Sequence, residues 1–166
     1  MRGILPAVRE RDDPETRALL AVHRLQAVYG DAVTRRAWHE VLALFEPEAV
    51  VHIDTRTRDP FSLHGSEELV AFIERSLDQF TFFEFTILNA VSDVDGDTAH
   101  GRVHICEVRC DRAGEWTTAY GLYHDRYRRR DRTWRIAERH YHSLARNGAR
   151  PEAFGLPPDR PGPPIL

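Results

Sequence analysis

Residues 82–110 read FFEFTILNAVSDVDGDTAHGRVHICEVRC, and both halves of this stretch are rich in β-branched and aromatic residues. Such residues favour strands, and the Asp95-Gly96 pair between the halves favours a tight hairpin turn. Two later segments have the same character and are joined by short polar connections. The sequence therefore predicts an antiparallel meander. Its four expected strands cover residues 82–94, 98–110, 116–129 and 133–144.

The sequence before the meander has helical periodicity. Asp13 followed by Pro14 indicates a helix start, because aspartate caps the first free N–H groups and proline fits the first turn. Apolar residues then recur at helical spacing, which predicts a first helix over residues 14–30. A second helix is expected over residues 38–45, and it should end before Pro47, which cannot continue a helix.

A short strand is expected at residues 50–54, followed by a polar loop and a third helix. Ser66 is the expected N-cap of that helix. Its predicted buried stripe consists of Leu69, Val70, Phe72, Ile73 and Leu77. Helices first and a meander second predict an α+β fold, in which three N-terminal helices pack on one face of a strongly curved, mainly antiparallel sheet.

One folded domain is expected, because 166 residues can bury a sizeable core. That domain should cover residues 14–146. Residues 1–13 are strongly charged and are expected to form a flexible arm. Residues 147–166 contain six of the ten prolines. This tail therefore cannot form a helix or an inner strand, and it should run over the surface or extend away from it.

The composition excludes several kinds of chemistry. All 23 cationic residues are arginine, against 26 acidic residues, so the net charge is −3. Without lysine the chain cannot form a Schiff base, anchor pyridoxal phosphate or build a Walker-type phosphate loop. Cys106 and Cys110 lie about 13 Å apart on one expected strand, too far for a disulfide. Reduced thiols, and the lack of a signal-peptide core or a membrane span, predict a cytoplasmic protein with no membrane partner.

Six arginines lie within residues 126–135, which raises the question of a nucleic-acid interface. A solvent-exposed hairpin explains them better, because the charge lies at an expected turn and few aromatic residues are interleaved with it. The chain is also net acidic. No nucleic-acid partner is therefore expected.

A set of residues spread along the chain occurs in a recognisable order. It comprises Tyr29, Trp38, Asn89, Gly96-Asp97-Thr98-Ala99, Gly121, Tyr123, Asp125 and Trp134-Arg135-Ile136 with Arg139. In this order the residues resemble the SnoaL-like family of the nuclear transport factor 2 superfamily, over about residues 17–145. The resemblance implies a cone-shaped α+β fold. Structural roles also explain most of the set, such as the turn for Gly96, the core for Trp134 and hydrogen-bond acceptance for Asp125.

The resemblance implies a homodimer that forms through the sheet, and an enzyme that needs no metal or organic cofactor. Scytalone dehydratase, bile-acid dehydratases, limonene epoxide hydrolase, ketosteroid isomerase and polyketide cyclases place acid–base side chains in the apolar cone, where burial raises the pKa of a carboxyl group. Tyr29 matches a tyrosine that dehydratase-like members place at the end of the first helix, although a core tyrosine is the alternative. Thr34 and Phe85 stand where those relatives have Asp and His.

Glu107 is the best remaining carboxylate for proton transfer. Alternation over residues 103–109 places it on the same face as Val103 and Ile105, and the resemblance to bile-acid dehydratases places an acidic residue there. It is expected to act as general base or acid, and the alternative is a salt bridge to an arginine near a strand end. His104 lies near the position of a catalytic histidine of scytalone dehydratase, but it faces the opposite side unless a bulge intervenes.

Further candidates come from the other strands. His52 shares a face of its short strand with Asp54 and is a candidate second acid–base group, although an exposed polar position is the alternative. Arg139 matches an arginine of the closing SnoaL-like strand. It is suited either to bind an anionic or carbonyl oxygen or to pair with Asp125. The expected substrate contacts are Phe85, Trp38, Tyr120, Asp54 and His142.

His140 and His142 share a face of the last strand, and His124 lies on the strand before it. Such a set suits zinc, but spacing fixes no third ligand. The resemblance implies no metal either, so none is expected. His142 or Ser143 also occupies the region where the bile-acid dehydratase pattern has a functional arginine.

These features predict a cofactor-independent acid–base enzyme that acts on a small, apolar, natural-product-like molecule. The reaction is expected to be a cyclisation, a dehydration, an isomerisation or an epoxide opening. Glu107 would move the proton, Tyr29 and Arg139 would orient or polarise an oxygen, and His104 or His52 would be the second acid–base group. The alternative is a noncatalytic ligand-binding or assembly module of the same fold, since the usual Asp and His are missing.

Overall fold

The computed structural model describes residues 13–148 and 150–157. Its helices are α1 (Pro14–Thr34), α2 (Trp38–Ala43) and α3 (Ser66–Leu77). Its strands are β1 (Phe45–Asp54), β2 (Phe61–His64), β3 (Phe80–Asp95), β4 (Thr98–Asp111), β5 (Trp116–Arg130), β6 (Thr133–Asn147) and β7 (Glu152–Ala153). The predicted arm, apart from Asp13, and the tail from residue 158 onward lie outside the described residues.

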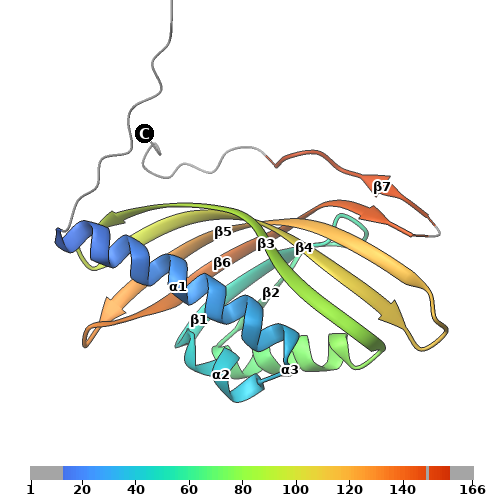
Figure 1. Ribbon diagram of the computed structural model, residues 1–166, viewed down its shortest axis with the longest axis horizontal. Coiled ribbons are helices and arrows are strands. Elements are labelled where there is room, and N and C mark those ends of the chain that lie inside the picture. The colour runs from blue at the N-terminus through green and yellow to red at the C-terminus, as the bar shows by residue number, and fades with distance from the viewer. Residues whose placement is uncertain (1–12, 149, 158–166) are drawn as a thin grey trace, which may run out of the picture.

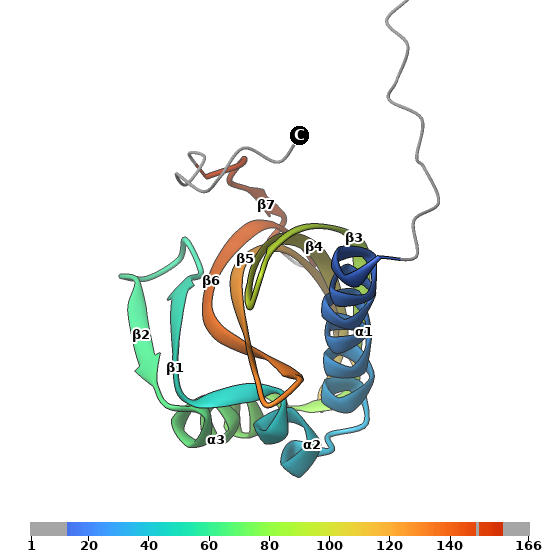
Figure 2. The same ribbon diagram turned by 90° about the vertical axis from the view of Figure 1, so that its left-hand side faces the viewer.

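The strands form one curved sheet in the order β2-β1-β6-β5-β4-β3, and β7 pairs with the end of β6. The predicted meander of four long antiparallel strands is confirmed, and Gly96 has a positive φ of 59° in the first hairpin. β1 runs parallel to β6. Figure 2 shows the sheet curling around the inside of the molecule, with α1 beside β3 and with α2 and α3 below. The α+β cone expected from the sequence is therefore the observed fold.

The side view shows α1 lying lengthwise along the sheet (Figure 1). Asp13 caps α1 as predicted, because its carboxylate accepts the Thr16 N–H at 2.9 Å. The buried face of α1 includes Val22, Leu25 and Tyr29, which pack against the concave face of the sheet. The four long strands twist and bend over this helix, so their alternate side chains point into one shared interior.

Three local predictions are wrong. The second helix ends at Ala43, and Phe45 already belongs to β1, which continues through Pro47. The register between β1 and β6 shifts between Phe45 and Val50, and such an irregularity tolerates a proline that lacks an N–H. Ser66 is the first residue of α3 and not its cap, because Gly65 takes that place with a φ of 90° and no side-chain cap.

The polar loop after β1 contains a short strand that periodicity did not predict. β2 pairs antiparallel with β1 and forms one edge of the sheet. In the tail, β7 pairs with β6 at Ala145 and Ala153, just beyond the point where β1 ends. This short edge pairing agrees with a proline-rich segment that cannot form an inner strand.

A buried polar network holds α1 to the sheet. The Asp125 carboxylate accepts hydrogen bonds from Gln26 Nε2 at 2.6 Å, from Tyr127 Oη at 3.0 Å and from Arg139 Nε and Nη2 at 2.8 and 2.7 Å. Asp125 is therefore the satisfied acceptor that the sequence suggested. Cys106 and Cys110 are both buried and free. Among the described residues, no helix combines the length and the apolar composition that crossing a membrane requires.

Candidate active site

A cavity of about 240 Å³ lies between the concave face of the sheet and helices α1 and α3. Its wall is mainly apolar. The apolar lining residues are Val33, Phe45, Val51, Ile53, Leu69, Phe72, Ile73, Leu77, Phe80, Phe83 and Phe85. Alternation explains this wall, since Val51 and Ile53 take the inward positions of β1 and Phe83 and Phe85 take those of β3. Such a wall suits a small apolar molecule.

Three tyrosines bring hydroxyl groups to this apolar space: Tyr29 from the end of α1, Tyr123 from β5 and Tyr141 from β6. Tyr29 and Tyr123 are hydrogen-bonded through their side chains, and burial raises the pKa of both hydroxyls above the usual value. Burial likewise raises the pKa of Tyr141 to about 12, and the Glu107 charge adds to the effect. All three phenols are therefore neutral hydrogen-bond donors near neutral pH.

Glu107 faces the cavity from β4, as alternation predicted. Val103 and Ile105 on the same face are fully buried, and Glu107 is 16% exposed. The Nε of Arg109 donates to Glu107 Oε2 at 3.0 Å, and Nη2 contacts the same oxygen. Although burial works against it, the Glu107 charge raises the pKa of Arg109. The salt bridge that the sequence left as an alternative therefore exists, and both of its members line the cavity.

Arg139 lines the cavity and is only 2% exposed. It makes the ion pair with Asp125 that was one of its two expected roles. Its guanidinium carbon also lies 3.8 Å from the ring centre of Tyr123 and 4.4 Å from that of Tyr29. Arg139 therefore fixes the rings of both tyrosines. Its Nη1 is buried and has no hydrogen-bond partner among the described residues.

The sequence profile of the SnoaL-like domain matches residues 14–140. The chain belongs to the SnoaL-like family. Among curated proteins, none has a sequence that matches it.

Solved structures show the same fold at low sequence identity. A hexachlorocyclohexane dehydrochlorinase, LinA type 2, is 14% identical with a TM-score of 0.72, covering 87% of this chain and 97% of that chain. A protein of Novosphingobium aromaticivorans that is named as a proposed scytalone dehydratase is 18% identical with a TM-score of 0.73, covering 89% and 97%. These likenesses confirm the cone-shaped α+β fold.

Two positions of this SnoaL-like protein differ in chemistry from the dehydratase pattern, and the structure gives both a structural role. Thr34 Oγ1 accepts the backbone N–H of Phe85 at 3.0 Å and so joins the end of α1 to β3. The Phe85 ring lines the cavity as expected. It packs edge-on to Tyr29 with ring centres 5.4 Å apart and stacks on Tyr123.

The histidines predicted for the site lie elsewhere. His104 is on the outer face of β4, because β4 pairs with β5 without a register shift and the nearby bulge falls in β3 between Ile87 and Asn89. His52 is also on the outer face, because Val51 and Ile53 take the inward positions of β1. The prediction that either histidine reaches the substrate is therefore wrong, and none of the described histidines lines the cavity.

Four of the five residues that were predicted to contact the substrate do not line the cavity either. Asp54 lies two residues after His52 and points to the same outer face, where its carboxylate accepts a hydrogen bond from the backbone N–H of Arg56. His142 lies on the outer face, 3.6 Å from Asp54. Tyr120 is 40% exposed just before the register shift between β5 and β6, and Trp38 packs against the core from α2 outside the cavity lining.

Eight polar lining residues received no site role from the sequence: Thr55, Arg58, Ser76, Gln79, Arg109, Tyr123, Tyr141 and Arg146. Arg109 lies two residues after Glu107 and so points to the same face of β4. Strand alternation could therefore have identified it. Arg146 lies beyond the predicted end of its strand, where it donates to the Thr55 carbonyl at 3.4 Å. Arg58 lies in the loop before β2 with its guanidinium over Phe61. Local periodicity carries no signal for either of these two arginines.

Proposed function

We propose that this SnoaL-like protein is an acid–base enzyme that works without a cofactor on a small, mostly apolar substrate held in the cone. The observation that carries this proposal is a single carboxylate, Glu107, at the wall of an apolar cavity beside three neutral tyrosine hydroxyls. A carboxylate removes a proton from carbon, and a phenol stabilises the negative charge that then develops on a substrate oxygen.

Glu107 is the proposed general base. Both contacts from Arg109 reach Oε2, and no described residue donates to Oε1, so Oε1 is the oxygen that takes the proton. An ion-paired carboxylate acts as an acceptor, which suits a base better than an acid. Arg109 is a positioning residue, because it fixes the direction of the carboxylate and does not itself exchange a proton.

The Tyr29–Tyr123 pair is the proposed donor to the substrate oxygen, because one hydroxyl donates to the other and the second O–H is left for the substrate. Their raised pKa values keep the O–H groups protonated, and their rings are fixed by Arg139. The Nη1 of Arg139 is a further donor for the same oxygen, in line with the second role expected from the sequence. Charge that develops near these groups is stabilised without reorganisation of solvent.

Cyclisation, dehydration and isomerisation include such a proton transfer from carbon, and epoxide opening includes one from water. An elimination is the leading reaction class, because the names of two structural relatives, a dehydrochlorinase and a dehydratase, both denote eliminations. In this class Glu107 takes a proton from one carbon and the leaving group departs from its neighbour. A natural-product-like substrate fits a wall formed mainly of aromatic and branched side chains.

The experiment is a screen of small apolar carbon acids that carry a leaving group, followed by variants. Glu107→Gln keeps the shape of the side chain and is expected to lower turnover by about a hundred- to ten-thousand-fold. Glu84→Gln is the matched control, because Glu84 is an exposed residue of the neighbouring strand β3 and faces away from the cavity. Unchanged turnover in Glu107→Gln would show that another group moves the proton.

A noncatalytic ligand-binding or assembly module is the second candidate. It is supported by the structural use of Thr34 and Phe85 at the positions of the dehydratase pair, and by a Glu107 that is already paired. A pH–rate profile separates the two functions. Catalysis gives one or two apparent pKa values, whereas a module that binds compounds in the cone turns none of them over at any pH.

We also propose that two copies associate through the outer face of the sheet. Phe82, Leu88, Trp116 and Tyr120 leave 40–58% of their surface exposed on β3 and β5, and the rings of Phe82 and Trp116 are in contact. Apolar surface of this kind is typical of an interface. Light scattering at micromolar concentration should give twice the mass of one chain, and the mass of a single chain would contradict the dimer. The two buried free thiols suit a reducing, cytoplasmic compartment.

A further inference from the structure

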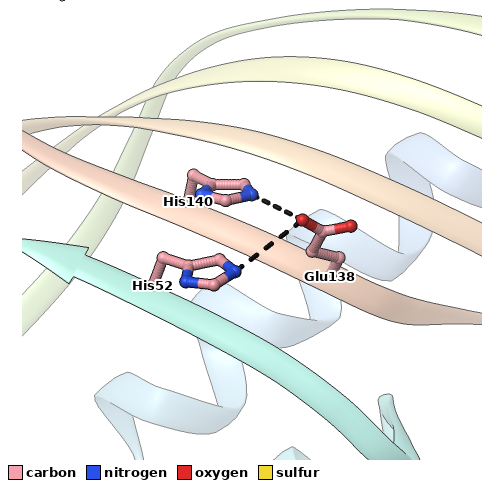
Figure 3. A group of neighbouring side chains, drawn as sticks. All are labelled: His52, Glu138 and His140. Atoms are coloured by element: carbon pink, nitrogen blue, oxygen red, sulfur yellow. Dashed lines mark hydrogen bonds and ion pairs between the residues drawn. The ribbon is translucent and has the colours of Figure 1, made fainter. Parts of the chain in front are cut away.

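Three metal-ligating side chains meet on the outer face of the sheet, on the other side from the cavity. They are His52 of β1 and Glu138 and His140 of β6, and their ligand atoms all lie within 4.8 Å of one another (Figure 3). His52 is in register with His140 where β1 and β6 run parallel, and Glu138 lies two residues before His140 on the same face. The fold therefore brings His52 next to Glu138 and His140, which lie far from it in the sequence.

Both imidazoles present Nε2 to the same oxygen of Glu138. The Nε2 of His140 lies 2.6 Å from Glu138 Oε1, and the Nε2 of His52 lies 3.8 Å from the same oxygen. The two imidazole rings stack with centres 4.1 Å apart, and in Figure 3 both point toward the carboxylate. Ligands about 2.0–2.1 Å from a tetrahedral zinc ion are about 3.3 Å apart. The two separations bracket this value, and the stacked imidazole rings would have to turn toward each other to share one ion.

Neighbouring groups hold two of the ligands in place. His52 Nδ1 is 2.7 Å from Ser62 Oγ on β2, which fixes the ring and directs Nε2 toward Glu138. Arg126 Nη1 donates to Glu138 Oε2 at 3.3 Å, and Oε1 faces the histidines.

We propose that His52, Glu138 and His140 bind one zinc ion through Nε2, Oε1 and Nε2, with the fourth position open to water. The side chain of His140 is 11% exposed, that of Glu138 29% and that of His52 39%. One side of the cluster is therefore open for the ion to enter, and the other side is sheltered. Two histidines and one glutamate are a donor set that zinc accepts.

The bound ion links β1 to β6, the one parallel pairing in the described sheet. It acts apart from the cavity, because the residues that alternate with these ligands, Val51, Arg139 and Tyr141, point to the opposite face. The expected effect is on stability, since an ion that binds only the folded chain raises its unfolding temperature. This inference does not depend on the proposed acid–base chemistry.

The test uses the full chain after treatment with a chelator. Isothermal titration with Zn²⁺ should show one ion per chain, and the unfolding temperature should rise with added Zn²⁺ until one equivalent is bound. Glu138→Gln and His52→Gln should each weaken zinc binding by at least about tenfold. Both ligands are partly exposed, so these variants are expected to fold, and circular dichroism checks that they do. His140→Gln serves as a third variant at the more buried ligand.

His39→Gln is the matched control, because this histidine of α2 is 86% exposed and lies outside the cluster. It should bind zinc as tightly as the natural chain. The proposal is overturned if the natural chain binds less than one equivalent. It is equally overturned if folded Glu138→Gln and His52→Gln bind as tightly as His39→Gln, because zinc would then be held by surface histidines in general.

Discussion

Replacing Asp125 by asparagine tests whether Arg139 is a buried charge held by one carboxylate. Asp125 accepts hydrogen bonds from Gln26, Tyr127 and two nitrogens of Arg139, and its side chain is completely buried. Asparagine offers one oxygen to these donors and turns an N–H₂ group toward the rest. Arg139 would then keep its charge in the interior without a counter-ion.

The expected cost follows from these contacts. Breaking a buried ion pair by removing one partner costs about 3–5 kcal/mol. Two donors that lose their acceptor, at about 1–3 kcal/mol each, give a similar value. With a urea dependence of about 2 kcal/mol per molar, a loss of about 4 kcal/mol lowers the unfolding midpoint by about 2 M.

Urea unfolding followed by circular dichroism measures this shift. Asp97→Asn is the control, because Asp97 forms a 2.6 Å ion pair with Arg129 but is 70% exposed. An exposed pair contributes less than about 1 kcal/mol, so its midpoint should move by less than about 0.5 M. If the midpoint of Asp125→Asn moves no further than that of Asp97→Asn, the reasoning about the buried network is refuted.

Three further predictions concern Tyr141 of the cavity wall and two residues that support the wall. The pKa of Tyr141 rises from 10.0 to about 12 on folding. The neutral phenol therefore stabilises the folded state fully below pH 10, and this stabilisation is lost as the pH rises from 10 to about 12. Tyr141→Phe should therefore flatten the fall of the unfolding temperature in that range, and an unaltered slope would contradict this. Gly121→Ala should destabilise the fold and reduce turnover, because the added methyl group meets the Tyr141 ring; unfolding that matches the natural chain would count against it. Thr34→Val removes the acceptor of the Phe85 N–H and should cost about 1–3 kcal/mol in urea unfolding, with no loss as the opposing result.

Local signals were enough for much of the fold. Asp95-Gly96 fixed the first hairpin, Asp13 with Pro14 marked the start of α1, and alternation placed Glu107 on the inner face. Each of these features depends on a residue and its near neighbours along the chain. The resemblance added Tyr29, which does line the cavity.

The remaining features depend on pairings between distant segments. The prediction of β1 began too late because Pro47 reads as a break, although a register shift accommodates it. His104 required a bulge to face inward, and the bulge formed in β3 instead. The meeting of His52 with His140 follows from the parallel register of β1 and β6, which no local pattern encodes.

The central claim is that Glu107 removes a proton from a substrate held in the cone. Deuterium uptake from D₂O at the reacting carbon, measured by NMR with saturating substrate and compared with the binding constant, tests it most directly. In Glu107→Gln the exchange rate should fall by about a hundred- to ten-thousand-fold while binding stays close to that of the natural chain. Exchange at the natural rate in this variant would contradict the claim.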